Sequence, residues 1–129
     1  MRLMTVIRLY TKIVNPSDFA FKLIHSLMIK GFTLNVICDK IALDKFVSKK
    51  INTENIHFSH LFESCNLQFF NYDILLNLSL KFIPQFSSFS NFIEIFNAND
   101  SKILNERISY FNFRGYPLKI FQNININLN

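Results

Sequence analysis

The chain has 129 residues, of which 50% are hydrophobic and 18% are charged, so it can form one domain with a sizeable core and is not disordered. Its net charge of +5 favours an acidic partner (nucleic acid, an acidic peptide or an anionic surface) without choosing among them. The sequence lacks an apolar run of the roughly 18 residues that cross a membrane, and its cysteines, Cys38 and Cys65, do not make a disulfide framework. We therefore expect a cytoplasmic protein that does not enter a membrane, with Cys38 a buried thiol.

The first fifty residues alternate strand and helix patterns. Residues 4–10 (MTVIRLY) and 32–38 (FTLNVIC) are apolar and β-branched, as in strands. Between them, the stretch NPSD beginning at Asn15 can cap a helix, and Gly31 can close it. Residues 39–50 predict a second helix. This order is typical of βαβ units with a parallel sheet.

The second half continues the alternation. Further strands are expected at residues 55–60, 72–78, 91–96 and 117–124. Residues 81–90 carry Pro and Ser and predict a short helical turn. A last helix should begin at a cap, Asn99 or Asp100, and end at Gly115. We predict a single α/β domain over residues 1–122, with residues 123–129 a frayed tail.

Glycine placement argues against a nucleotide-binding enzyme. Phosphate sites in α/β sheets need glycines directly after the first strand, where backbone amides approach the phosphate. Here that strand is followed by TKIVNPSD, and the only glycines, Gly31 and Gly115, fall at predicted helix ends. The chain therefore has neither a P-loop nor a dinucleotide fingerprint, and we expect no cofactor.

Other candidate chemical groups have structural interpretations. His57, His60 and Cys65 match no standard zinc spacing, and we interpret the histidines as structural. A Cys–His nucleophile would need an orienting group and an activated thiol that the sequence does not identify. Asp73 should lie at the beginning of a strand, whereas working residues of parallel sheets gather at the carboxyl ends, so it is a structural candidate.

The last helix carries two adjacent stripes of side chains. The stripe expected to pack on the sheet consists of Leu104, Ile108 and Phe111. The neighbouring stripe places Arg107, Tyr110 and Arg114 on one face. It is either a core-facing Tyr with two solvated Arg, or an apolar pocket rimmed by guanidinium groups. The pocket would suit an acidic peptide that ends in a hydrophobic residue and a free carboxylate, with Lys102 adding charge on the flank.

Several blocks, in order along the chain, resemble the chi subunit of bacterial DNA polymerase III, a clamp-loader accessory protein. The strongest is residues 73–96 (DILLNLSLKFIPQFSSFSNFIEIF), followed by residues 106–118 (ERISYFNFRGYPL). RLY near the start, residues 19–38 and HFSH fit more weakly in the right order. The resemblance implies a three-layer α/β/α fold with a largely parallel, Rossmann-like sheet and no catalytic activity.

The resemblance also implies partners. Chi proteins are adaptors that bind the psi subunit, which connects them to the clamp loader, and the acidic C-terminal tail of single-stranded DNA-binding protein, which ends in Pro-Phe. Contact with DNA would then be indirect. The family's tail pocket uses a Lys followed by an Arg-x2-Tyr-x3-Arg pattern on the last helix. Counting forward from Asp100, the positions Arg107, Tyr110 and Arg114 fit this pattern, with Lys102 beside the Lys position at Ile103.

A second register is possible because the last helix is about two residues shorter than in the family. Counting back from Gly115 places Asn105 and Ile108 where the key Arg and Tyr belong. We prefer the first register because it keeps charge and ring on one face. The family's Leu-Trp pair after the second helix has no Trp equivalent here, and Ile51 is the nearest apolar substitute. The predicted peptide-binding residues are therefore Lys102, Arg107, Tyr110, Arg114 and Ile51.

Two other functions stay open as alternatives. Arg and aromatic side chains could bind single-stranded nucleic acid directly, although the basic residues are sparse and scattered. A small α/β enzyme is disfavoured by the missing glycine loop and by the lack of a convincing acid–base pair. The adaptor hypothesis predicts binding of a peptide that ends in Asp-Ile-Pro-Phe, weakened by salt and by Arg107→Ala.

Overall fold

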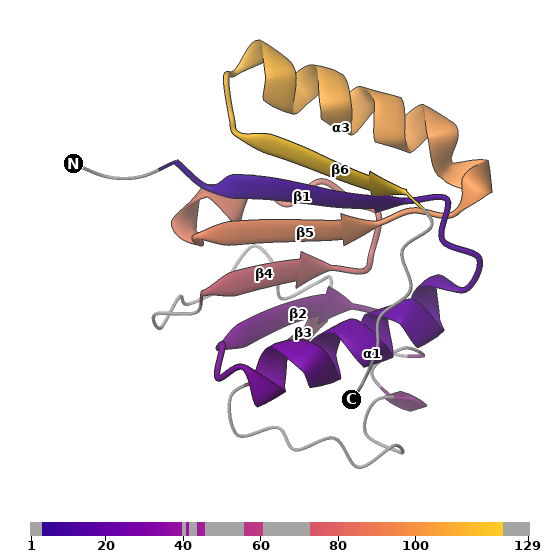
Figure 1. The fold of residues 1–129 in the computed structure, drawn as a ribbon, viewed down its shortest axis with the longest axis vertical. Coiled ribbons are helices and arrows are strands. Elements are labelled where there is room, and N and C mark those ends of the chain that lie inside the picture. Colours follow the sequence, from indigo (N-terminus) through magenta and orange to yellow (C-terminus); the bar gives the residue numbers. More distant parts are fainter. Residues whose placement is uncertain (1–3, 40, 42–43, 46–55, 61–72, 123–129) are drawn as a thin grey trace.

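The computed structural model describes residues 4–39, 41, 44–45, 56–60 and 73–122. The strands are β1 (Val6–Thr11), β2 (Leu34–Cys38), β3 (Ile56–His60), β4 (Ile74–Asn77), β5 (Asn91–Ile95) and β6 (Leu118–Gln122). They form a six-stranded sheet in the order β3-β2-β4-β5-β1-β6, and every neighbouring pair is parallel. All arrowheads point the same way, so the carboxyl ends share one edge (Figure 1). The predicted α/β fold with a largely parallel sheet is confirmed.

Helix α1 (Pro16–Ile29) begins and ends where the sequence predicts. The Asn15 side chain accepts a hydrogen bond from the Asp18 backbone N–H at 3.1 Å, and Pro16 occupies the first turn. Gly31 has a left-handed φ of 85°, which lets the Phe32 N–H bond back to the Leu27 carbonyl at 3.2 Å. Both ends of the helix thus have partners for backbone groups that the helix leaves unpaired.

Helix α3 (Ser101–Phe113) follows the short 3-10 helix η3 (Ala98–Asp100). The side-chain cap comes from Asn97, which accepts from the Asn99 N–H, while Asp100 accepts from the Asn97 N–H. Asp100 thus occupies the N-cap position of α3, as predicted, but its side chain makes no capping hydrogen bond to α3, because it takes part in the cap of η3 instead. Gly115 closes the helix with φ 75°, as predicted.

The sheet separates two hydrophobic core clusters, since successive strand residues point to opposite faces. One cluster lies under α1 and consists of Ile13, Phe19, Ala20, Leu23, Ile24, Leu34, Val36, Cys38, Ile74, Leu76, Ile93 and Ile95. The other lies against α3 and the 3-10 helix η2 (Pro84–Ser88) and consists of Ile7, Leu9, Ile37, Leu75, Ile83, Phe86, Phe89, Phe92, Phe96 and Phe111.

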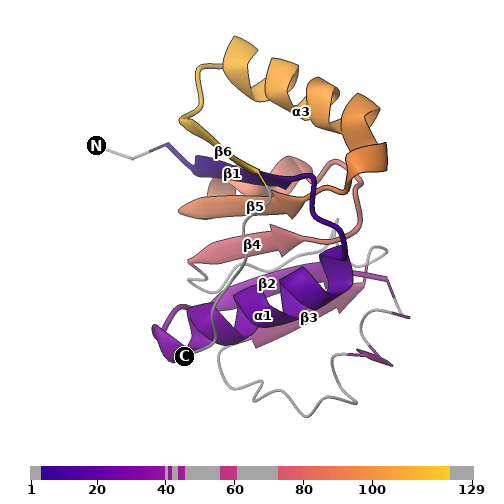
Figure 2. The same ribbon diagram turned by 45° about the vertical axis from the view of Figure 1, so that its right-hand side comes forward.

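Figure 2 shows α1 in front of the strands and α3 away from it, in agreement with these two clusters. Within the second cluster, Phe111 is fully buried and Leu104 and Ile108 pack around it, as predicted for the sheet-facing stripe. The complete three-layer α/β/α arrangement stays a prediction. It depends in part on the helix expected at residues 39–50, where the structure describes helical backbone only at Ile41, Asp44 and Lys45.

The remaining predicted elements agree in type and differ in length. The helical turn expected at residues 81–90 is η2, and the final strand is β6. Asp73 lies one residue before β4, and its carboxylate accepts from the Thr33 N–H and hydroxyl at 3.1 Å each, which ties the amino ends of β4 and β2 together. Residues 61–72 and the tail 123–129 lie outside the described residues. None of the described helices has the length and apolar character that a bilayer crossing requires.

Candidate peptide-binding site

Helix α3 presents its predicted binding residues in three different environments. Lys102 and Arg114 are exposed to solvent, and Tyr110 is half-buried. Arg107 is only 7% exposed and belongs to the protein interior. The fifth predicted residue, Ile51, lies outside the described residues. The C-terminal end of the stripe, at Tyr110 and Arg114, therefore reaches the surface, whereas its middle residue, Arg107, makes its contacts inside the protein.

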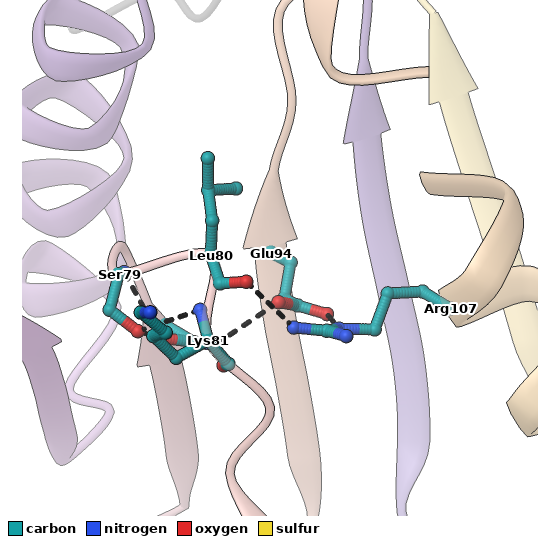
Figure 3. A network of polar contacts seen from close by, with 6 residues as sticks. Ser79, Leu80, Lys81, Glu94 and Arg107 are labelled. Carbon is teal, nitrogen blue, oxygen red and sulfur yellow. Dashed lines mark hydrogen bonds and ion pairs between the residues drawn. The ribbon is translucent and has the colours of Figure 1, made fainter. Parts of the chain in front are cut away.

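Arg107 forms an ion pair with Glu94 of β5, whose side chain is fully buried. Its Nε donates to Glu94 Oε1 at 2.8 Å, and one terminal guanidinium nitrogen donates to the Leu80 carbonyl at 3.0 Å (Figure 3). Buried charges are retained only when they are paired and hydrogen-bonded in this way. Arg107 is therefore occupied within the chain, and we drop it from the set of residues that contact a peptide directly.

Asn77 completes the environment of Glu94 from the neighbouring strand. The register pairs Asn77 of β4 with Glu94 of β5, and the Asn77 amide donates to Glu94 Oε2 at 3.1 Å. The same amide nitrogen donates to the Lys81 carbonyl at 2.6 Å, while the Asn77 side-chain oxygen accepts from the Ser79 N–H and hydroxyl. One polar network thus joins two strands, the loop after β4 and α3.

Burial dominates the protonation of this carboxyl group. Loss of solvent raises the pKa of Glu94 to about 7, and the Arg107 charge and the hydrogen bonds from Arg107 and Asn77 only partly oppose that rise. The carboxyl group therefore changes its charge near neutral pH, unlike an ordinary surface Glu.

The exposed end of the stripe is a stacked cation and ring. The Arg114 Cζ lies 3.6 Å from the centroid of the Tyr110 ring, and its guanidinium also reaches the Tyr110 carbonyl at 3.4 Å. Tyr110 in turn packs edge-on against Phe82 with ring centroids 4.8 Å apart. A guanidinium that lies flat on a ring keeps N–H groups on its edge, where they can bind a carboxylate with two hydrogen bonds.

Tyr110 and Arg114 border a shallow, almost flat depression on the solvent side of α3, which we call the α3 hollow. Its described lining consists of Asn105, Glu106, Ser109, Tyr110, Phe113 and Arg114. Phe113 is 86% exposed and Phe82, beside Tyr110, is 38% exposed, so large apolar side chains flank the cation. Lys102 lies on the same helical stripe as Glu106 and Ser109, one turn toward the N-terminus. The site thus offers an exposed guanidinium beside exposed aromatic rings.

Sequence reasoning placed both guanidinium groups around one pocket, and the structure separates them. Sequence reasoning also missed three residues of the site and its surroundings: Glu94, Phe82 and Phe113. The signal for Glu94 was available: an acid inside the apolar run NFIEIF must be buried and needs a positive partner. Phe113 directly precedes Arg114, the last residue of the predicted stripe, and it is the last residue of α3, so its exposure depends on where the helix ends. The alternative register puts Asn105 in the hollow but Ile108 in the core contacts.

The other candidate groups give no second centre in the part of the chain that the structure describes. His57 and His60 belong to β3, and Cys65 lies outside the described residues. No cluster of His, Cys, Asp or Glu suited to a metal ion occurs among the described side chains. Cys38 is 1% exposed, as predicted, and burial raises the pKa of its thiol to about 11, so it is not an activated nucleophile.

Two further cavities bear on the alternative functions. One of about 340 Å³ lies at the carboxyl ends of the strands, and its lining includes Asp39, Lys45, Leu78, Asn97 and Asp100. The other, of about 470 Å³, lies beside α1 on the opposite face from α3. Its lining includes two cations, Arg8 and Lys30, and several aromatic rings, and no acid among the described residues.

Comparisons with known proteins add no relative. Neither the scan against protein-family models nor the search of curated proteins finds a match to this chain.

Proposed function

We propose that this chain is a non-catalytic adaptor of the DNA polymerase III clamp-loader assembly, working during DNA replication in the cytoplasm. It binds the acidic C-terminal tail of single-stranded DNA-binding protein in the α3 hollow, and a psi subunit on another surface. Its contact with DNA is indirect. The proposal extends the resemblance to chi subunits with a site built from the described residues, in which Arg107 is replaced by Phe82 and Phe113.

The stacking of Arg114 on Tyr110 at the border of the α3 hollow carries the proposal. The ring holds the guanidinium in place, so less side-chain entropy is lost when a carboxylate binds. A terminal carboxylate would bind the guanidinium edge while the last hydrophobic side chain packs on Phe113 or Phe82. Lys102 would attract the acidic residues that precede that end.

The test is a titration with a labelled peptide that ends in Asp-Ile-Pro-Phe. Arg114→Ala is expected to weaken binding about tenfold or more, because hydrogen bonds to a charged group contribute about 1.5–3 kcal/mol each. The matched control is Lys30→Ala, which removes the same charge from the α1 side of the molecule, where Lys30 lines the 470 Å³ cavity. Equal weakening by both variants would show that only net charge matters and would overturn the site.

A second candidate function is direct binding of single-stranded nucleic acid in the cavity beside α1. Tyr10 and Phe121 stack there with ring centroids 4.8 Å apart and planes at 20°, next to Arg8. Aromatic rings with nearby cations are the usual platform for unpaired bases. A titration with single-stranded DNA at the same salt concentration separates the two functions. Under this second function Lys30→Ala would weaken DNA binding and Arg114→Ala would not.

A further inference from the structure

The loop between β4 and η2 adopts a conformation that its surroundings must hold in place. Leu80 has φ 62°, in the left-handed region that non-glycine residues adopt at a cost of about 1–2 kcal/mol. Two side chains hold the backbone at Leu80 and at the residue directly after it. Arg107 donates to the Leu80 carbonyl, and Asn77 donates to the Lys81 carbonyl. Both of these donors also bind Glu94.

The same loop places an aromatic ring against Tyr110, which borders the α3 hollow. Phe82 follows Lys81 directly, and the Arg107 Cζ lies 5.5 Å from the centroid of the Phe82 ring. Phe82 packs edge-on against Tyr110, and Tyr110 carries Arg114 at 3.6 Å. A continuous series of contacts therefore runs from Glu94 in the sheet, through Arg107 and Phe82, to the exposed cation.

We propose that Glu94 is a positioning residue for peptide binding: through Arg107 it fixes the loop Ser79–Phe82, so that Phe82 supports the Tyr110–Arg114 stack that receives the peptide carboxylate. Glu94 itself touches no ligand, because its side chain is fully buried. This inference rests on the proposed function. It adds that Glu94, at the buried end of the contact series, controls the affinity of the α3 hollow for the peptide.

The charge state of Glu94 should then control the hollow. An ionised carboxylate adds the Coulomb attraction of an ion pair to the hydrogen bond that it accepts from Arg107, and a neutral carboxyl group lacks this attraction. The described groups that face Glu94 are Arg107 from α3 and Asn77 from β4, while β1 places the apolar Leu9 beside it in register. Guanidinium groups are not deprotonated in proteins and amides do not titrate, so the proton on Glu94 is the variable in this network.

The experiment measures binding of the labelled peptide ending in Asp-Ile-Pro-Phe from pH 6 to pH 8.5. The peptide carboxylates are ionised throughout this range, so their titration does not contribute. In the wild-type chain we expect affinity to increase about fivefold with rising pH, the lower end of usual coupling between sites. Glu94→Gln keeps the size of the side chain and removes its charge. It should bind weakly with a flat profile, except for any slope that the three histidines contribute in both proteins.

A second readout does not depend on peptide binding. Hydrogen exchange of the backbone amides in Ser79–Phe82 should be faster in Glu94→Gln than in the wild type, while the amides of α1 stay unchanged. If the peptide binds neither protein, the proposed function fails and this exchange measurement still tests the positioning role. The inference would be overturned if Glu94→Gln bound the peptide with the same affinity and the same pH slope as the wild type. It would also be overturned if hydrogen exchange in Ser79–Phe82 were the same in both proteins.

Discussion

At the scale of single residues, Arg107 of α3 and Glu94 of β5 form the buried ion pair that joins the middle of α3 to the sheet. Their charges are buried together, with Nε and Oε1 2.8 Å apart. Taking two charges out of water costs about as much as their attraction returns, but removing one partner leaves the other buried and unpaired. We therefore expect the chain to tolerate loss of the whole pair far better than loss of one member.

This asymmetry gives a stability prediction. Arg107→Ala should lower the free energy of unfolding by about 3–5 kcal/mol, whereas the double replacement Glu94→Leu, Arg107→Met should lower it much less. Urea unfolding of the two proteins measures the difference. A double variant that is less stable than Arg107→Ala would show that the pair is a net source of stability. Because Arg107→Ala disturbs the fold, weakened peptide binding by that variant is not evidence of direct contact.

Glu106 provides a prediction for binding at the same scale. It lines the α3 hollow beside Arg114 and is exposed, so its negative charge opposes an acidic peptide. Glu106→Gln should strengthen binding of the Asp-Ile-Pro-Phe peptide by up to about fivefold, the effect of an exposed charge contact of about 1 kcal/mol. Fluorescence anisotropy at low and high salt measures it. The gain should shrink at high salt, and a gain that salt does not change would contradict the electrostatic explanation.

At the scale of elements, local signals in the sequence predicted helix boundaries well where a specific backbone conformation is needed. Asn15 caps α1, and Gly31 and Gly115 end α1 and α3 with φ of 85° and 75°. Asp100 holds the N-cap position of α3 as predicted, but the side-chain cap that forms here is that of Asn97 on η3, since Asn97, Asn99 and Asp100 are all good capping residues. Which of them caps depends on the extra 3-10 turn, and that turn is not evident from composition.

Gly115 can be tested directly. A Cβ built on it meets nothing within 4 Å, so Gly115→Ala should cost only the left-handed backbone conformation, about 1–2 kcal/mol of unfolding free energy. Gly115→Asn is the matched control, since Asn adopts this conformation more readily and should cost less. Thermal or urea unfolding measures both. Equal costs for Ala and Asn would point to a contact made by the substituted side chain instead.

The site was harder to predict than the elements, because it depends on which groups lie opposite each cation of α3. Periodicity places Arg107, Tyr110 and Arg114 on one stripe, and the structure agrees. It cannot show that the middle of the stripe meets an acid from β5. That contact requires the sheet order and the register, which put Asn77 and Glu94 side by side near the carboxyl ends of their strands.

At the scale of the whole molecule, Glu94 gives the folding stability a pH dependence. Burial raises the pKa of the Glu94 carboxyl group in the folded chain to about 7, from the 4.5 of an unburied Glu. The folded state therefore binds more protons in this window, so this contribution to stability is fully present below about pH 4.5 and is lost as pH rises through about 7. Urea unfolding of the wild type should show this decline between pH 5 and 8, and Glu94→Gln should lack it.

The two pH effects of Glu94 run in opposite directions. Ionisation of Glu94 lowers the stability of the fold and orders the loop that supports the hollow. We therefore expect the wild-type chain to unfold more easily at pH 8 than at pH 6, yet to bind the peptide more tightly there. Stability and affinity that rise together with pH would contradict this separation.

The most direct test of the central claim is an NMR titration of the isotopically labelled full chain with the acidic peptide ending in Asp-Ile-Pro-Phe, compared with the same peptide carrying a C-terminal amide. We predict saturable shifts at Tyr110, Phe113 and Arg114 with the free-acid peptide, and much weaker shifts with the amide. Shifts confined to the surface around Arg8 and Tyr10, or equal responses to both peptides, would contradict binding of a terminal carboxylate in the α3 hollow.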